Sequence, residues 1–229
     1  MSNHSIGRSS TSRLRPLWAV AHIKRWTAAA LPAGLLVALL AGCAASSPAP
    51  VLLSLPPVLG AAPAASATGA VGTAATPTVL AVRRVNIPEY LVARRVRFRA
   101  DASTLAEWPN TYWAERIEIG VSREFVSALR PWLPGWSLCD TNCGDQIPAF
   151  TLQVDIVPMD YVRSVQTLQA RARITLSDAS AAPKVLRTEE LTYEIAATAD
   201  TAQGHAQALA DLIRHGAAAA APIVRSARP

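Results

Sequence analysis

Three segments near the C-terminus, in which apolar and polar residues alternate strictly, constrain the fold of this chain most strongly. They cover residues 150–156, 168–176 and 191–195. Alternation with a period of two predicts strands with one buried and one solvated face. Polar loops around 160–165 and 177–183 separate the segments, so we expect the three strands to pair as an antiparallel meander.

Two helices are expected in addition to these strands. Apolar residues recur every three or four positions from Trp113 to Trp132, with Asn110 or Thr111 as the expected N-cap. Prolines at positions 131 and 134 end this helix. A second helix is expected over 201–224, with a narrow, alanine-rich apolar stripe.

The remaining strands are expected before the first helix. They cover residues 51–55, 78–85, 96–100 and a brief stretch at 103–107 bounded by Pro109. The sequence therefore predicts an α+β fold, an α/β sandwich. Its sheet is mixed and largely antiparallel, with two principal helices packed on it.

The N-terminal segment looks like an export signal. Basic residues precede an uncharged apolar run of about 13 residues that closes with Leu-Ala-Gly-Cys at positions 40–43. This order predicts a secretory signal, because a membrane span needs roughly 20 apolar residues. The ending resembles the lipobox of bacterial lipoproteins, which implies lipidation of Cys43. An ordinary signal peptide and a membrane helix with an incidental cysteine are the alternatives.

The lipobox divides the chain into three parts. We expect a signal peptide at 1–42, then a lipidated tether with the first short strand and a low-complexity loop at 43–77, and the main domain at 78–229, to which strand 51–55 also belongs. Ala44 stands where an aspartate would favour retention in the inner membrane. The resemblance therefore implies the outer membrane.

The apparent basic charge of +6 comes from the signal. Five of the 22 basic residues and none of the 16 acidic residues precede Cys43, which leaves 17 basic and 16 acidic residues in the mature chain. A nearly neutral exported domain needs no polyanionic partner, so no nucleic acid is expected.

Cys139 and Cys143 are the two cysteines that remain after Cys43. In an oxidising compartment a disulfide between them is the expected state. A metal site is the alternative, but it lacks a second pair of ligands and a nearby histidine. We expect no metal and no cofactor.

Reactive groups are few in the mature chain. His205 and His215 lie ten residues apart on the last predicted helix and face different sides. The sequence has no nucleophile elbow, no His-Glu-x-x-His motif and no phosphate-binding glycine loop. Glu189 and Glu190 are neighbours on a strand and point to opposite faces. We therefore expect no catalytic residues and no enzymatic activity.

The most distinctive stretch of the mature chain is Ile87-Pro88-Glu89-Tyr90-Leu91. Together with Tyr112-Trp113-Ala114-Glu115, the lipobox, strand 51–55 and the final Ala/Leu-rich helix, it resembles the ABC-type transport auxiliary lipoproteins (PqiC/YmbA-like). Val92-Ala93-Arg94 replaces the Asp-Arg that usually follows the leucine in that family, and the loop at 60–77 is long.

The resemblance implies a non-catalytic lipoprotein at the outer membrane, facing the periplasm. It would serve a lipid transport system with an inner-membrane ABC permease and ATPase and an MCE-domain protein. We expect contacts with the MCE protein, or with a second copy in a homo-oligomer, from residues of the turn and the nearby aromatic pair. These residues are Ile87, Pro88, Glu89, Tyr90, Leu91, Trp108 and Tyr112.

Alternative interpretations remain at this point. Trp108 and Tyr112 flank Pro109, where they would be either part of the core or partly exposed for a partner. A lipid-binding module would need an apolar cavity. An envelope-assembly lipoprotein would act without a transporter partner.

Overall fold

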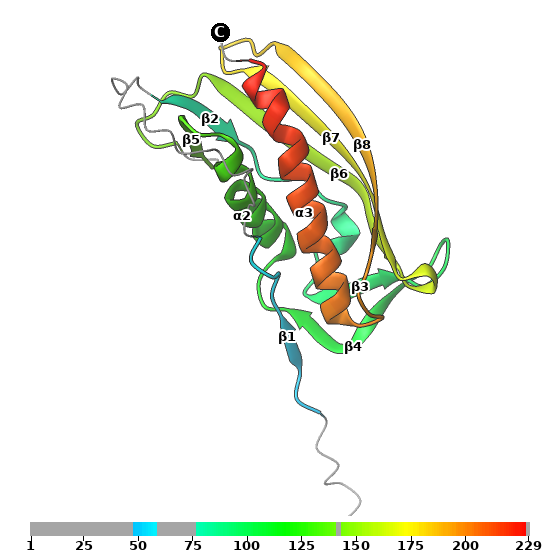
Figure 1. Ribbon diagram of the computed structural model, residues 1–229. Helices are drawn as coiled ribbons and strands as arrows, with labels where there is room; N and C mark the ends of the chain where they lie inside the picture. The colour runs from blue at the N-terminus through cyan, green and yellow to red at the C-terminus, as the bar shows by residue number, and fades with distance from the viewer. Residues whose placement is uncertain (1–47, 59–76, 141–142, 228–229) are drawn as a thin grey trace, which may run out of the picture. The chain divides into compact units, whose positions relative to one another are not determined.

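The computed structural model describes residues 48–58, 77–140 and 143–227 (Figure 1). Within these residues the strands are β1 (Val51–Leu53), β2 (Thr78–Val82), β3 (Arg95–Arg99), β4 (Leu105–Trp113), β5 (Trp136–Cys139), β6 (Phe150–Val162), β7 (Thr167–Asp178) and β8 (Val185–Ala196). The helices are α2 (Ile117–Leu129) and α3 (Ala202–Arg225), and the 3₁₀ turns are η1 (Glu89–Leu91), η2 (Arg130–Trp132) and η3 (Arg163–Val165).

All eight of these strands belong to one mixed sheet that branches at β6. One path runs β1-β4-β3-β6-β2-β5, while β7 pairs with β6 and β8 with β7. The ladders β6–β7, β7–β8 and β3–β4 are antiparallel, and the pairings β1–β4, β2–β5, β2–β6 and β3–β6 are parallel. Helices α2 and α3 lie on the same face of the sheet (Figure 1). The predicted α+β class and the antiparallel meander are confirmed.

The core lies between the sheet and α3. The inward positions of β6 and β7 that the alternation predicts are buried, among them Leu152, Val154, Leu168 and Ile174, except for Phe150, which is half-buried. The stripe of α3 is buried as predicted and consists of Ala206, Leu209, Ala210, Ile213, Ala217, Ala220 and Val224. Its small side chains let the helix approach the sheet closely.

The first turn of α3 is fixed by local contacts. The Thr201 hydroxyl oxygen accepts a hydrogen bond from the Gly204 amide at 3.0 Å, an N-cap that satisfies one of the free amides. A Cβ on Gly204 would lie well inside contact distance of the Ala199 carbonyl oxygen. Glycine at this position therefore allows the close approach of the preceding loop to the helix.

The start of the first helix was predicted wrongly. Residues 105–113 form the single strand β4, which continues through Pro109, and α2 begins only at Ile117 with Arg116 as N-cap. β4 pairs with β1 on one side and β3 on the other, and these pairings outweigh the helical spacing of the apolar residues. Trp113 is buried all the same, from a strand and not from a helix.

Other boundaries also differ from the prediction. β6 runs to Val162, through the start of the expected loop, and β5 was not predicted at all. β6 carries a bulge between Ile156 and Met159. The bulge interrupts the alternation that marks a strand in the sequence, so the continuation of β6 beyond it was not predicted. The end of α2 at Leu129 before Pro131 agrees with the prediction.

Candidate docking site at the branch of the sheet

β2 and β3 both pair with β6. The segment between β2 and β3 lies at the point where these two strands separate. Beyond β2 the chain stays next to β6 as far as Asn86, whose amide donates to the Val154 carbonyl at 2.9 Å and whose carbonyl accepts from the Ile156 amide at 2.8 Å. The chain then leaves the sheet through η1 and returns as β3, which meets β6 again at Val162. The 87–91 segment therefore occupies the branch of the sheet.

Residues 87–91 differ in exposure. Ile87 is only 6% exposed and Pro88 is buried, so both belong to the packed part of the branch. Tyr90 and Leu91 are half-buried, and Glu89 alone of the five is exposed. Among these five of the residues predicted to contact a partner, Glu89 is the one whose side chain is exposed.

Asp160 on β6 anchors the turn to the sheet. Its carboxylate is buried, accepts a hydrogen bond from the Tyr90 hydroxyl at 3.0 Å and forms an ion pair with Arg99 at 2.9 Å. Burial, together with the neighbouring Asp160 carboxylate, raises the pKa of Tyr90. Arg97 donates to the Tyr90 carbonyl at 2.8 Å. This network fixes the backbone of η1 and therefore the direction of Glu89.

A groove of about 340 Å³ runs beside the turn. It is lined by Arg84, Val85, Asn86, Ile87, Glu89, Val92, Arg116 and Glu118. Arg116 and Glu118 form an ion pair with each other at the start of α2. The exposed side chains of Arg84 and Glu89 make no ion pair or hydrogen bond within the described part of the chain. The groove thus combines an apolar wall with one unpaired cation and one unpaired anion.

Trp108 is not exposed, and its predicted role at a surface is wrong. It is 6% exposed, and its ring lies 4.9 Å from Phe98 and 6.2 Å from Tyr161, measured between centroids. The Arg163 guanidinium covers it at 4.6 Å. β4 continues through Pro109, but its alternation shifts at Asn110, whose φ is +51°, and the β3–β4 register shifts there too. Trp108 therefore lies in the core, while Tyr112 is half-buried on the outer face.

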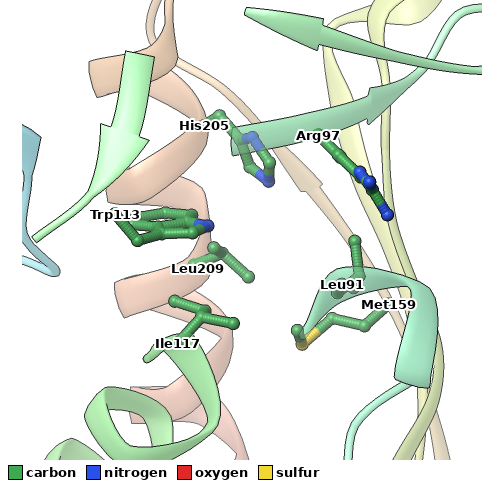
Figure 2. A pocket seen from close by; sticks show the side chains of 7 residues that line it. All are labelled: Leu91, Arg97, Trp113, Ile117, Met159, His205 and Leu209. Atoms are coloured by element: carbon green, nitrogen blue, oxygen red, sulfur yellow. The ribbon is translucent and has the colours of Figure 1, made fainter. Parts of the chain in front are cut away.

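A small enclosed cavity lies behind the turn, between the sheet and α3 (Figure 2). Its lining residues, with Trp113 and His205 pointing inward, are Leu91, Arg97, Trp113, Ile117, Met159, His205 and Leu209. Its volume is about 10 Å³, which is room for about one water molecule. This cavity is far too small for an acyl chain.

His205 lies among aromatic rings in this cavity, which Arg97 also lines. The imidazole stacks on Tyr161 at 4.7 Å, and Trp113 approaches it edge-on at 6.3 Å. Burial lowers the pKa of His205 to about 3, so the ring is neutral at neutral pH. His215 is exposed on another side of α3, as its spacing predicted.

Cys139 and Cys143 form the expected disulfide. Cys43 and the whole signal segment lie outside the described residues. In the ranges that the structure describes, no three histidine, cysteine or acidic residues are grouped to hold a metal ion. Nor does the described part of the chain include a helix long and apolar enough to cross a bilayer.

Comparison with known proteins identifies the family. The model of the ABC-type transport auxiliary lipoprotein component family matches residues 58–221. The chain belongs to this family. The match covers the branch, the groove and most of α3, so the auxiliary lipoprotein carries its candidate site within the family domain.

Solved structures with the same fold are only distantly related in sequence. One uncharacterized protein aligns with a TM-score of 0.60 and 17% identity over 77% of the auxiliary lipoprotein and 99% of its own chain. Protein XCC0632 from Xanthomonas campestris, of the DUF330 family, aligns with a TM-score of 0.53 and 12% identity, covering 77% and 92%. No curated protein sequence matches.

Sequence reasoning missed the residues that build the groove around Glu89. Arg84 and Arg116 lie 32 positions apart and meet only because α2 packs beside the end of β2, where Ser122 accepts a hydrogen bond from the Val85 amide at 3.0 Å. Asp160 was assigned to a loop, although its position before a run of alternating residues was a weak signal for a strand. No local pattern connects it with Tyr90.

Proposed function

We propose that this auxiliary lipoprotein is a non-catalytic docking component of an ABC/MCE-type intermembrane lipid transport system. In this proposal Cys43 is lipidated, the protein is anchored in the outer membrane and faces the periplasm, and the domain binds the MCE-domain protein of the system. The observation that carries the proposal is the family match over residues 58–221, together with the lipobox at 40–43.

The groove beside Glu89 is the docking surface in this proposal. It lies on a rigid support, because Tyr90, Arg99 and Asp160 fix the turn against β6. Its unpaired charges, Arg84 and Glu89, favour a partner segment with complementary charges. Ile87 contributes apolar surface to the wall of the groove. A preformed site of this kind loses little conformational entropy when a partner binds.

Charge reversal in the groove tests the docking proposal. The double variant Arg84→Glu, Glu89→Arg alters two exposed side chains that have no partner among the described residues, so the thermal unfolding temperature should stay unchanged. Co-purification with the MCE-domain protein of the same organism should fall at least tenfold, since two rim charges then face like charges on the partner.

A matched control uses an exposed acid far from the groove. Glu194 on β8 also makes no ion pair within the described ranges, and Glu194→Arg should leave co-purification unchanged. Equal recovery of the MCE-domain protein with the double variant and with wild type would refute docking through this groove.

A further inference from the structure

One row of side chains crosses the outer face of the sheet at its β1 edge. Leu52 on β1 is in register with Tyr112 on β4, and Tyr112 is in register with Arg95 on β3. Residues in register on neighbouring strands point to the same face, so these three side chains lie side by side. The Arg95 guanidinium lies 5.1 Å from the centre of the Tyr112 ring.

This row exposes apolar surface that the fold does not use. Leu52 is 62% exposed. The next residue, Leu53, is in register with Trp113, and both point into the core. Leu52 and Tyr112 therefore face away from the helices, on the side of the sheet that α2 and α3 leave uncovered (Figure 1).

The polypeptide is fixed to the domain on both sides of β1. The Asn110 side-chain amide donates to the Ala49 carbonyl at 2.9 Å. After the strand, the Val58 amide donates to the buried Glu124 carboxylate at 3.0 Å. The position of β1 in the domain is therefore set from Ala49 onwards.

The chain between Cys43 and Ala49 is too short to hold the domain far from a membrane. Six residue steps separate these positions, and a fully extended chain spans at most about 3.5 Å per residue, or about 20 Å in total. The β6 strand alone has 13 residues and is about 43 Å long at 3.3 Å per residue. A lipid on Cys43 thus keeps the β1 end of the domain near the bilayer.

We propose that the row Leu52, Tyr112 and Arg95 is a membrane-contact surface that rests on the phospholipid headgroups. The proposal depends on the lipidation of Cys43 proposed above. A leucine, a tyrosine and an arginine match the interface of a bilayer, where aromatic rings lie at headgroup level and arginine binds phosphate. One nitrogen of Arg95 contacts Glu107 at 3.3 Å, and guanidinium has further donors for a phosphate oxygen.

Site-specific fluorescence quenching in membranes tests this surface. The lipidated full-length protein is placed in vesicles of phosphatidylethanolamine and phosphatidylglycerol that contain brominated lipids. A cysteine introduced at Leu52 or at Tyr112 carries the fluorophore. It is the only free thiol, because the chain has three cysteines, of which Cys139 and Cys143 form a disulfide and Cys43 is acylated. We expect quenching at both positions.

Leu186 provides the matched control. It is an apolar residue of similar exposure, 49%, near the start of β8, at the other end of the sheet. The next residue, Arg187, is in register with Leu176 of β7, which pairs with Leu152 of β6, ten residues before Val162, where β3 meets β6. The distance along β6 is therefore on the order of 30 Å. Quenching at Leu52 and Tyr112 should exceed that at Leu186 at least twofold.

The position at Tyr112 decides the outcome, because it is remote from Cys43 in sequence. Quenching at Tyr112 no stronger than at Leu186, in protein that floats with the vesicles, would overturn the contact surface and leave the anchor intact. Protein that does not float would overturn the lipidation of Cys43 and this proposal with it. Leu52→Glu should reduce quenching at Tyr112 without loss of flotation.

Discussion

The two halves of the sheet are built in different ways. The meander β6–β7–β8 joins segments that follow one another in the chain, and its two long antiparallel ladders are each interrupted by one register shift. The branched half joins distant segments, such as β1 with β4 and β2 with β6. The branched half also holds the buried aromatic and polar groups around His205. Regular, local pairing provides the scaffold, while irregular, long-range pairing creates the turn and the groove.

This difference predicts that stability depends most on side chains of the branched half. Trp108→Ala should lower the free energy of unfolding by about 3–5 kcal/mol, because it removes a large buried ring between Phe98 and Tyr161. Tyr112→Ala on the outer face of the same strand should cost less than about 1 kcal/mol. Urea denaturation measures both. Equal losses for the two variants would contradict the assignment of Trp108 to the core.

A second prediction concerns pH and the buried His205. The pKa of His205 is lowered to about 3 in the folded state, against an ordinary value near 6.5 in the unfolded chain. As the pH falls, His205 therefore binds a proton in the unfolded chain before it can do so in the folded protein. The contribution of the neutral imidazole to the free energy of unfolding is complete above pH 6.5 and is lost as the pH falls toward 3. The loss approaches about 1.4 kcal/mol per pH unit within that window.

The measurement is urea denaturation of wild type and His205→Leu at several pH values between 7 and 4.5. As the pH falls, the free energy of unfolding of the wild type should decrease relative to that of the variant, since leucine binds no proton. A difference that stays constant with pH would show that the imidazole is not held neutral in the core.

The smallest effect is expected on the solvent face of the meander. Arg173 on β7 and Glu190 on β8 form a cross-strand ion pair at 2.7 Å. Both side chains are more than half exposed, so their coupling should be about 0.2–1 kcal/mol and should decrease with salt. A double-mutant cycle with alanine at both positions measures it. A coupling free energy above about 2 kcal/mol would contradict the expectation that exposed ion pairs of the meander contribute little to stability.

The sequence allowed part of the candidate site to be predicted. The 87–91 segment was recognised as the most distinctive stretch, and Glu89 is indeed exposed in it. Trp108 was misjudged because a proline beside it suggested a chain break, whereas β4 continues through Pro109 and carries Trp108 into the core. The partners of the turn, Asp160 and Arg116, come from other parts of the chain, and no local pattern indicates them.

By itself, the sequence determined the α+β class, the meander, the buried stripe of α3 and the cysteine pair, because these depend on residues that are near each other in the chain. The tertiary structure decided the branch at β6, the boundary between β4 and α2, the groove beside Glu89 and the outer row of Leu52, Tyr112 and Arg95. The physical reason is that strand pairing satisfies backbone hydrogen bonds across any distance in sequence. A local apolar pattern is compatible with several such pairings, and only the complete sheet selects one.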